Sequence, residues 1–372
     1  MNVRMFVRWN FVVAMLLVDL LGCSKGSAPE ILPTNGPPRV LYLSPDEQER
    51  LQLFALSPDD GVVTQLTHAK GDVWDFDVAP DGSRIAYSVL DDQERADLWQ
   101  VDRTGKESIL LKCPEAACIW PSWSSDSTRL AYERTDLSSS EIGLYSGPTV
   151  SQIWLLDVSS GKTEPLFEDG EALGTNPSWA PVGENVAFYS LVESAVLIYD
   201  LETQTSSLFD TLEGVGSWSP DGQQLAIPYI LYREDLEVSN VARLDLTDGS
   251  AIDLSQSEVG EEEHFWQDAS PVWSPTGEWI ALGRSGLPDG TWTWGQQLWL
   301  IRPDGSDAWP LVIDKDANLG AFAWRPDGQA LIYLRVPREQ IADPIPELWL
   351  VSLEDEQTRL LTTNAVMPAW GP

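Results

Sequence analysis

The chain has 372 residues, of which 58 are Asp or Glu and 23 are Lys or Arg, so its formal net charge is −35. This charge argues against nucleic acid and anionic lipid surfaces as partners. It predicts either a solvated acidic surface or a site for a cation or a basic partner.

The N-terminal segment, residues 1–22, has the pattern of an export signal. Arg4 and Arg8 precede an apolar run from Phe11 to Leu21, and the segment ends in Leu-Leu-Gly before Cys23. This ending resembles the lipobox of bacterial lipoproteins, which implies that Cys23 carries a lipid. An ordinary secretory signal and a short transmembrane anchor are the alternatives, although the run is short for a bilayer. Residues 23–38, rich in Ser, Gly and Pro, predict a flexible tether.

Residues 39–372 are organised by a repeat in which a Trp precedes a Ser-Pro-Asp-Gly-like turn and an apolar triplet. The Trp-equivalent positions lie 39 to 56 residues apart, a period typical of propeller blades. They are Val78, Trp123, Trp179, Trp218, Trp273, Trp324 and Trp370. Pro and Asp favour the turn, Gly accepts a positive φ, and each Trp is expected to pack between neighbouring blades.

Each repeat contains a further aromatic-rich segment with the pattern of a third strand. These segments are residues 97–102, 152–157, 196–200, 241–245, 297–301 and 347–351. Residues 39–67 have three strand segments and residues 364–370 have one, so the two ends together predict one composite blade that closes the ring. The fold class is therefore all-β, a seven-bladed β-propeller, with six blades as the alternative.

The Trp-Ser-Pro-Asp-Gly repeat, followed by Leu-Ala-Tyr-like and Leu-Trp-Leu-Val-like strands, is similar to the WD-like repeats of the TolB propeller family. The resemblance covers nearly all of residues 39–372 and implies the fold rather than a function. The resemblance implies six blades and a separate N-terminal domain for TolB itself. This chain has seven motif anchors and the sequence predicts no such domain, so the partners of TolB are not expected to carry over to it.

Cysteine usage predicts a disulfide. With Cys23 assigned to the lipid, Cys113 and Cys118 are an even pair in an exported chain. No His or further Cys lies nearby to make a metal site with them. We expect no cofactor; Ca²⁺ in the acidic loops is the alternative, although no twelve-residue calcium loop is present.

The alternation of strands places the tight Pro-Asp-Gly turns on one face and the long insertions on the other. Because binding residues concentrate in variable loops on a rigid scaffold, we expect the insertion face to be functional. The candidate binding residues there are Glu261, Glu262, Glu263, His264, Phe265, Trp266, Asp289, Trp292 and Trp294. Exposed Trp beside carboxylates suits a peptide, a sugar or a basic protein segment. Alternatively, Trp292 and Trp294 cap their own hairpin.

Catalysis has little support in the sequence. The chain has only two histidines, His68 and His264, and no Gly-x-Ser-x-Gly motif. The sequence therefore predicts a non-enzymatic, monomeric, lipid-anchored propeller in an extracytoplasmic compartment that binds a protein or peptide of the cell envelope. A carbohydrate-binding or carbohydrate-active propeller is the alternative.

Overall fold

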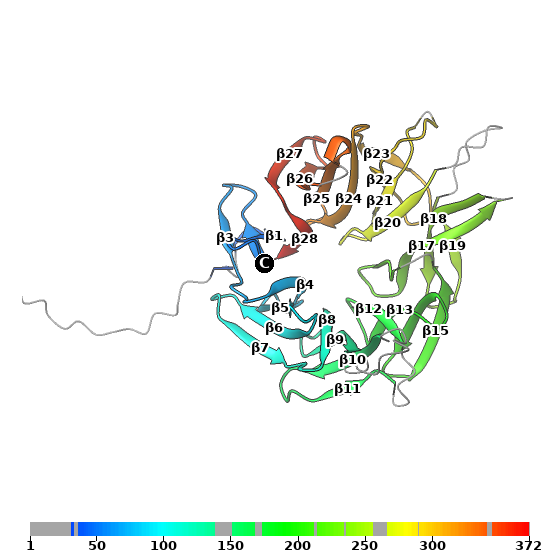
Figure 1. Ribbon diagram of the computed structural model, residues 1–372. Coiled ribbons are helices and arrows are strands. Elements are labelled where there is room, and N and C mark those ends of the chain that lie inside the picture. Colours follow the sequence, from blue (N-terminus) through cyan, green and yellow to red (C-terminus); the bar gives the residue numbers. More distant parts are fainter. Residues whose placement is uncertain are drawn as a thin grey trace, which may run out of the picture.

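The computed structural model describes residues 31–32, 36–137, 151–167, 173–211, 214–233, 236–255, 266–288, 290–340 and 344–371. These residues form an all-β propeller. Figure 1 shows the sheets arranged in a ring. The strands next to its centre include β4 (Asp72–Val78), β20 (Asp268–Trp273) and β28 (Val366–Gly371), and those at its outer edge include β7 (Glu107–Leu111), β11 (Thr163–Pro165) and β15 (Thr205–Asp210). Within the described ranges, no helix is long and apolar enough to cross a membrane.

The two ends of the chain share one sheet. Its order is β28-β1-β2-β3, and β28 pairs antiparallel with β1 through Val40 and Trp370. The strands are β1 (Arg39–Pro45), β2 (Leu51–Leu56), β3 (Val63–Gln65) and β28 (Val366–Gly371). The predicted pairing of the two ends is thus confirmed.

The next eight strands form one continuous sheet. The antiparallel sets β4-β5-β6-β7 and β8-β9-β10-β11 are joined by a single parallel pair between β6 and β8, Ala96 with Ala117. The strands are β4 (Asp72–Val78), β5 (Arg84–Leu90), β6 (Ala96–Asp102), β7 (Glu107–Leu111), β8 (Ala116–Trp123), β9 (Arg129–Asp136), β10 (Ser151–Asp157) and β11 (Thr163–Pro165).

Four further sheets each contain four antiparallel strands in chain order. The first two consist of β12 (Gly174–Trp179), β13 (Asn185–Ser190), β14 (Ala195–Asp200), β15 (Thr205–Asp210), and of β16 (Ser217–Trp218), β17 (Gln224–Arg233), β18 (Leu236–Asp245), β19 (Ala251–Asp253). The last two consist of β20 (Asp268–Trp273), β21 (Ile280–Arg284), β22 (Gln297–Ile301), β23 (Trp309–Val312), and of β24 (Ala317–Trp324), β25 (Ala330–Pro337), β26 (Glu347–Ser352), β27 (Thr358–Thr363). A short 3₁₀ helix, η2 (Arg338–Gln340), follows β25.

The motif Trp residues connect neighbouring sheets, as predicted. Four of them donate the indole N–H to a backbone carbonyl near the end of the first strand in the preceding set of four strands. The pairs are Trp123 with Asp77 (3.2 Å), Trp218 with Ser178 (3.3 Å), Trp324 with Val272 (3.0 Å) and Trp370 with Ala323 (3.1 Å). The core is correspondingly a series of apolar clusters, each shared by adjacent sheets.

Candidate functional site

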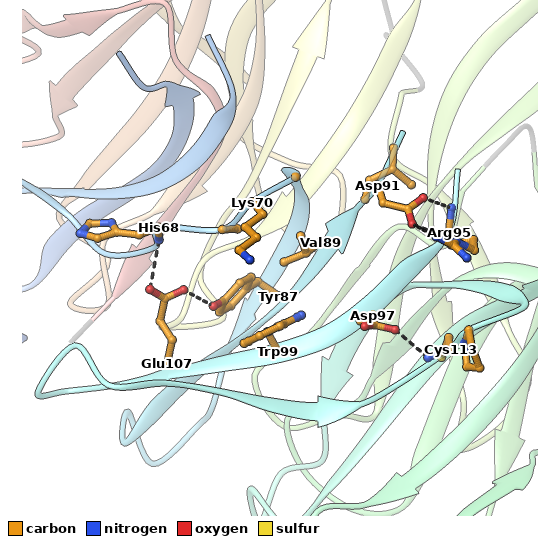
Figure 2. A pocket seen from close by; sticks show the side chains of 14 residues that line it. His68, Lys70, Tyr87, Val89, Asp91, Arg95, Asp97, Trp99, Glu107 and Cys113 are labelled. Atoms are coloured by element: carbon orange, nitrogen blue, oxygen red, sulfur yellow. Dashed lines mark hydrogen bonds and ion pairs between the residues drawn. The ribbon is translucent and has the colours of Figure 1, made fainter. Parts of the chain in front are cut away.

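A pocket of about 640 Å³ lies between the loop that joins β3 to β4 and the strands β5, β6 and β7 (Figure 2). His68 and Lys70 border it from the loop, and Pro114 borders it from the segment after β7. These loops belong to the face on which the sequence places its long insertions. The pocket is therefore on the expected face, but in a different part of the ring from the expected residues.

The wall of the pocket on β5 and β6 is mainly apolar. Tyr87 and Trp99 are register partners on these strands, and Val89 lies two residues beyond Tyr87. Tyr87 is fully buried, whereas Trp99 and Val89 are half-buried. Figure 2 shows the Tyr87 and Trp99 rings side by side below Lys70. Such aromatic surface can contact the apolar part of a small ligand.

Glu107, the first residue of β7, is held by two donors. The Tyr87 hydroxyl donates to Oε2 (2.6 Å) and the backbone N–H of His68 donates to Oε1 (3.1 Å). Burial, and then the bond to Glu107 and its charge, raise the pKa of Tyr87. The phenol therefore stays protonated and continues to donate, which fixes the carboxylate at the edge of the pocket.

The exposed His68 lies at the junction of two pockets. Its Nδ1 is 2.6 Å from the backbone oxygen of Thr67, and because a carbonyl only accepts, Nδ1 carries the proton in the neutral ring. The Nε2 lone pair is then available to a ligand. His68 also borders a second pocket of about 330 Å³, which contains Asp46, Glu47 and Arg50.

The charges around the larger pocket are unevenly compensated. Asp91 forms two bonds with Arg95, from Nε (2.9 Å) and from the terminal nitrogen (2.6 Å). Asp97 accepts the backbone N–H of Cys113 (2.7 Å), and within the described part of the chain no cation pairs with it. Lys70 is exposed and points into the pocket (Figure 2).

A disulfide joins Cys113 to Cys118. Cys113 borders the pocket and Cys118 lies on β8, so the bond ties the pocket wall to the next set of strands. No group of three or more His, Cys, Asp or Glu is placed to hold a metal ion in the ranges that the structure describes.

The structure does not bring the predicted binding residues to this pocket. Trp266 is packed against the Arg284 guanidinium, whose carbon is 4.4 Å from the ring, and Trp294 lies beside Arg338 at 5.5 Å. Trp292 is 59% exposed and borders neither of the two pockets. Cys23, Glu261, Glu262, Glu263, His264, Phe265 and Asp289 lie outside the described residues.

Two buried carboxyl groups on β4 were not singled out from the sequence. Asp75 accepts the Ser88 hydroxyl and the Trp120 N–H, both at 2.8 Å, and burial raises its pKa to about 7. Asp77 accepts the Trp123 N–H (2.7 Å), and burial raises its pKa to about 6. Both acids link β4 to β8, so we assign them a structural role. Their signal in the sequence is the alternation Trp-Asp-Phe-Asp at residues 74–77.

Comparison with known proteins gives a distant sequence relative. No protein-family model matches the chain. The "Uncharacterized peptidase YuxL" of Bacillus subtilis is 26% identical over 219 residues, which are 57% of this chain and 28% of the relative. The chain thus spans little more than a quarter of that protein.

Solved structures share the fold. TolB from Acinetobacter baumannii matches with a TM-score of 0.50 and 17% identity, covering 90% of this chain and 67% of TolB. The fold is that of the TolB-like propellers. Oligogalacturonate lyase from Vibrio parahaemolyticus matches with a TM-score of 0.60 and 14% identity, over 86% and 92% of the two chains. A puromycin-hydrolyzing peptidase of Mycobacterium tuberculosis matches with a TM-score of 0.59 and 14% identity, covering 92% of this chain and 56% of the peptidase.

These comparisons overturn one prediction from the sequence. The chain was expected to be a non-catalytic interaction module and not an enzyme, because it lacks a familiar nucleophile motif. The relative and two of the matched propellers are named as a peptidase, a lyase and a peptidase, which contradicts that expectation. The absence of a few familiar catalytic motifs does not exclude other chemistry on this fold, which is why the prediction was wrong.

Proposed function

We propose that the protein is an enzyme that acts on peptides and that the pocket beside β5, β6 and β7 binds the substrate. The observation that carries the proposal is the composition of this pocket. It offers aromatic surface from Trp99, carboxylates from Asp97 and Glu107, and a volume of about 640 Å³, which suits one or two amino-acid side chains. The distant relative named as a peptidase supports the same class of substrate.

The proposal gives the polar groups separate roles. Glu107 is oriented by Tyr87 and by the His68 N–H, so it is the group best placed to accept a proton from bound substrate or water. The Nδ1 of His68 faces the Thr67 carbonyl, so Nε2 is the ring nitrogen left to contact the substrate at the pocket edge. Trp99 and Val89 contact the apolar part of the substrate.

The test is hydrolysis of an internally quenched peptide library by the full chain. We expect turnover by the wild type and at least tenfold slower turnover by Glu107→Gln, which keeps the size of the side chain and removes its charge. Asp102→Asn, at the last residue of β6 and outside the pocket, is the matched control and should keep full activity. No turnover by the wild type, or equal loss in both variants, would contradict the proposal.

A second candidate function is action on saccharides. Oligogalacturonate lyase supports it, because the match covers 92% of that enzyme and so includes nearly the whole of its chain. Aromatic rings beside carboxylates also suit a sugar. Turnover of an oligosaccharide panel without peptide turnover would favour this candidate.

We further propose that the ring has seven blades. The eight-stranded sheet divides into β4–β7 and β8–β11, which touch through one residue pair, and each half has the strand order of the other sheets. An experimental structure with six or eight blades would contradict this count.

Lipidation of Cys23 is also proposed; a Cys23→Ser chain that still takes up labelled fatty acid would refute it.

A further inference from the structure

One position beside the third-strand Trp is occupied by arginine in three parts of the ring. The pairs Tyr132–Trp154, Leu282–Trp299 and Tyr333–Trp349 have the same register as Tyr87–Trp99. Two residues after the first member of each pair stand Arg134, Arg284 and Arg335, but the equivalent residue on β5 is Val89.

Two of these arginines place the guanidinium beside the ring of the Trp, and the third bonds to a glutamate that itself contacts the Trp. The guanidinium carbon lies 5.1 Å from the ring of Trp154 in one case and 4.9 Å from the ring of Trp299 in another. In the third, Arg335 donates to Glu347 (3.0 Å), its register partner, and Glu347 also accepts the indole N–H of Trp349 (2.9 Å). The site is therefore built repeatedly for a planar cation.

On β5 and β6 the surroundings of Arg335 recur without an arginine. Asp97 is the register partner of Val89, as Glu347 is of Arg335, and Trp99 lies two residues further on. The short Val89 side chain cannot fill the space of a guanidinium, and the pocket lies there. Asp97 and Glu107 both accept hydrogen bonds from neutral donors, so the described residues leave their negative charges without a paired cation. Lys70 borders the same pocket, and the described residues show no carboxylate partner for it.

We propose that this pocket binds a guanidinium group of the ligand, in the place that an arginine of the chain itself occupies in three other sets of strands. The guanidinium stacks on Trp99 and bonds to Asp97, with Glu107 adding negative charge at the other end of the pocket. This deepens the proposed function by naming arginine as the side chain that the enzyme selects.

The test compares N-acetyl-arginine amide with N-acetyl-citrulline amide by calorimetry on the full chain. Citrulline has nearly the same shape without the charge, so we expect it to bind at least tenfold more weakly. Asp97→Asn should weaken binding of the arginine amide at least tenfold. Asp102→Asn is the matched control, because Asp102 lies on the same strand as Asp97 but outside the pocket, and this variant should bind the arginine amide within threefold of the wild type.

Val89→Arg supplies the missing guanidinium from the chain and should abolish binding, with an unchanged circular dichroism spectrum. Should this variant fail to fold, Asp97→Asn decides alone. Equal binding of the two amides, no binding of either, or unaltered affinity in Asp97→Asn would overturn the inference.

The outcome is separable from that of the proposed function. Peptide hydrolysis without preference for arginine would leave the enzyme proposal standing and refute the guanidinium site. Binding of the arginine amide without any hydrolysis would do the reverse. Glucosamine, tested in parallel, distinguishes a guanidinium site from one for any amine, and equal affinity for it would refute the assignment to arginine.

Discussion

The sheets β4–β7 and β20–β23 use the same position in opposite ways. In β20–β23, Arg284 lies between Trp266 and Trp299 and bonds to Asp268 through two nitrogens, and the Arg284 and Asp268 side chains are 2% and 0% exposed. In β4–β7, Val89 leaves the equivalent space open beside Trp99. The repeat scaffold therefore tolerates either an internal cation or a cavity, and the cavity is where a ligand can enter.

The same contrast extends to buried carboxylates. Asp268 is neutralised by its arginine partner, whereas Asp75 and Asp77 on β4 are held by N–H and O–H donors without a paired cation among the described residues. Burial without a cation is what raises the pKa of these two acids. The sheet β20–β23 thus pairs its buried Asp268 with an arginine, whereas β4 buries two carboxyl groups whose pKa is raised.

The largest effect is expected from Arg284→Val, which imposes the β5 residue on β21. It leaves the buried Asp268 without its partner, and removal of one member of a buried pair costs about 3–5 kcal/mol. Urea denaturation should show this loss in the free energy of unfolding. The double variant Arg284→Val with Asp268→Ala should recover part of it, because no unpaired charge remains. A loss under about 1 kcal/mol in the single variant would contradict the contrast.

The second effect concerns the pH dependence of stability. The pKa of Asp75 is about 7 in the folded chain against an ordinary 3.8, so the folded state keeps a proton that the unfolded state releases. The free energy of unfolding should therefore fall as pH rises from about 4 to about 7, by on the order of 4 kcal/mol at most. In Asp75→Asn this group no longer titrates, and the slope over that window should be smaller.

Asp77→Asn serves as the companion variant. Because the pKa of Asp77 is about 6, its removal should flatten the profile between about pH 4 and 6 and leave the slope from 6 to 7 unchanged. Urea titrations at half-unit steps of pH measure both profiles. Identical profiles in the wild type and the Asp75 variant would show that this acid ionises normally.

The fold could be predicted from the sequence because its determinants are local and repeated. The Trp before each turn, the Gly at positive φ in Gly82, Gly222 and Gly328, and the two unmatched ends identify strands and their pairing. These signals survive substitutions, since each repeat supports the same assignment. The parallel contact between β6 and β8 has no signal in the sequence.

The site could not be predicted in the same way. The sequence favours Trp292 and Trp294 because an exposed Trp beside acids suits a ligand, but pocket formation depends on which side chain fills the space next to a strand. The available signal was a difference between repeats, Val89 against Arg134, Arg284 and Arg335. That difference becomes meaningful only when the register places each of these residues beside a Trp.

A smaller effect is expected at the motif Trp of β20. Trp324 and Trp273 are both 7% exposed, but only the indole N–H of Trp324 has an acceptor in the described chain, the carbonyl of Val272. Trp324→Phe should therefore cost about 1 kcal/mol more than Trp273→Phe in free energy of unfolding, because it also breaks a buried hydrogen bond. Equal losses in thermal denaturation would show that the bond is not stabilising.

The smallest effect should come from Arg134→Val, which makes the same exchange as Arg284→Val where the cation is accessible. The Arg134 side chain is 29% exposed and its partner Asp136 is 58% exposed, so water already screens the pair. Loss of the pair and of the contact with Trp154 should cost less than about 1 kcal/mol in urea denaturation. A cost equal to that of Arg284→Val would mean that packing on Trp, rather than burial of an unpaired Asp268, determines both values. The size of the gap between these two variants therefore measures how much of the arginine's value at this position comes from its charge partner. If the gap is as large as expected, replacing the arginine by valine costs little stability wherever no buried acid depends on it. This is the situation on β5, where Asp97 is half-buried and accepts the Cys113 N–H.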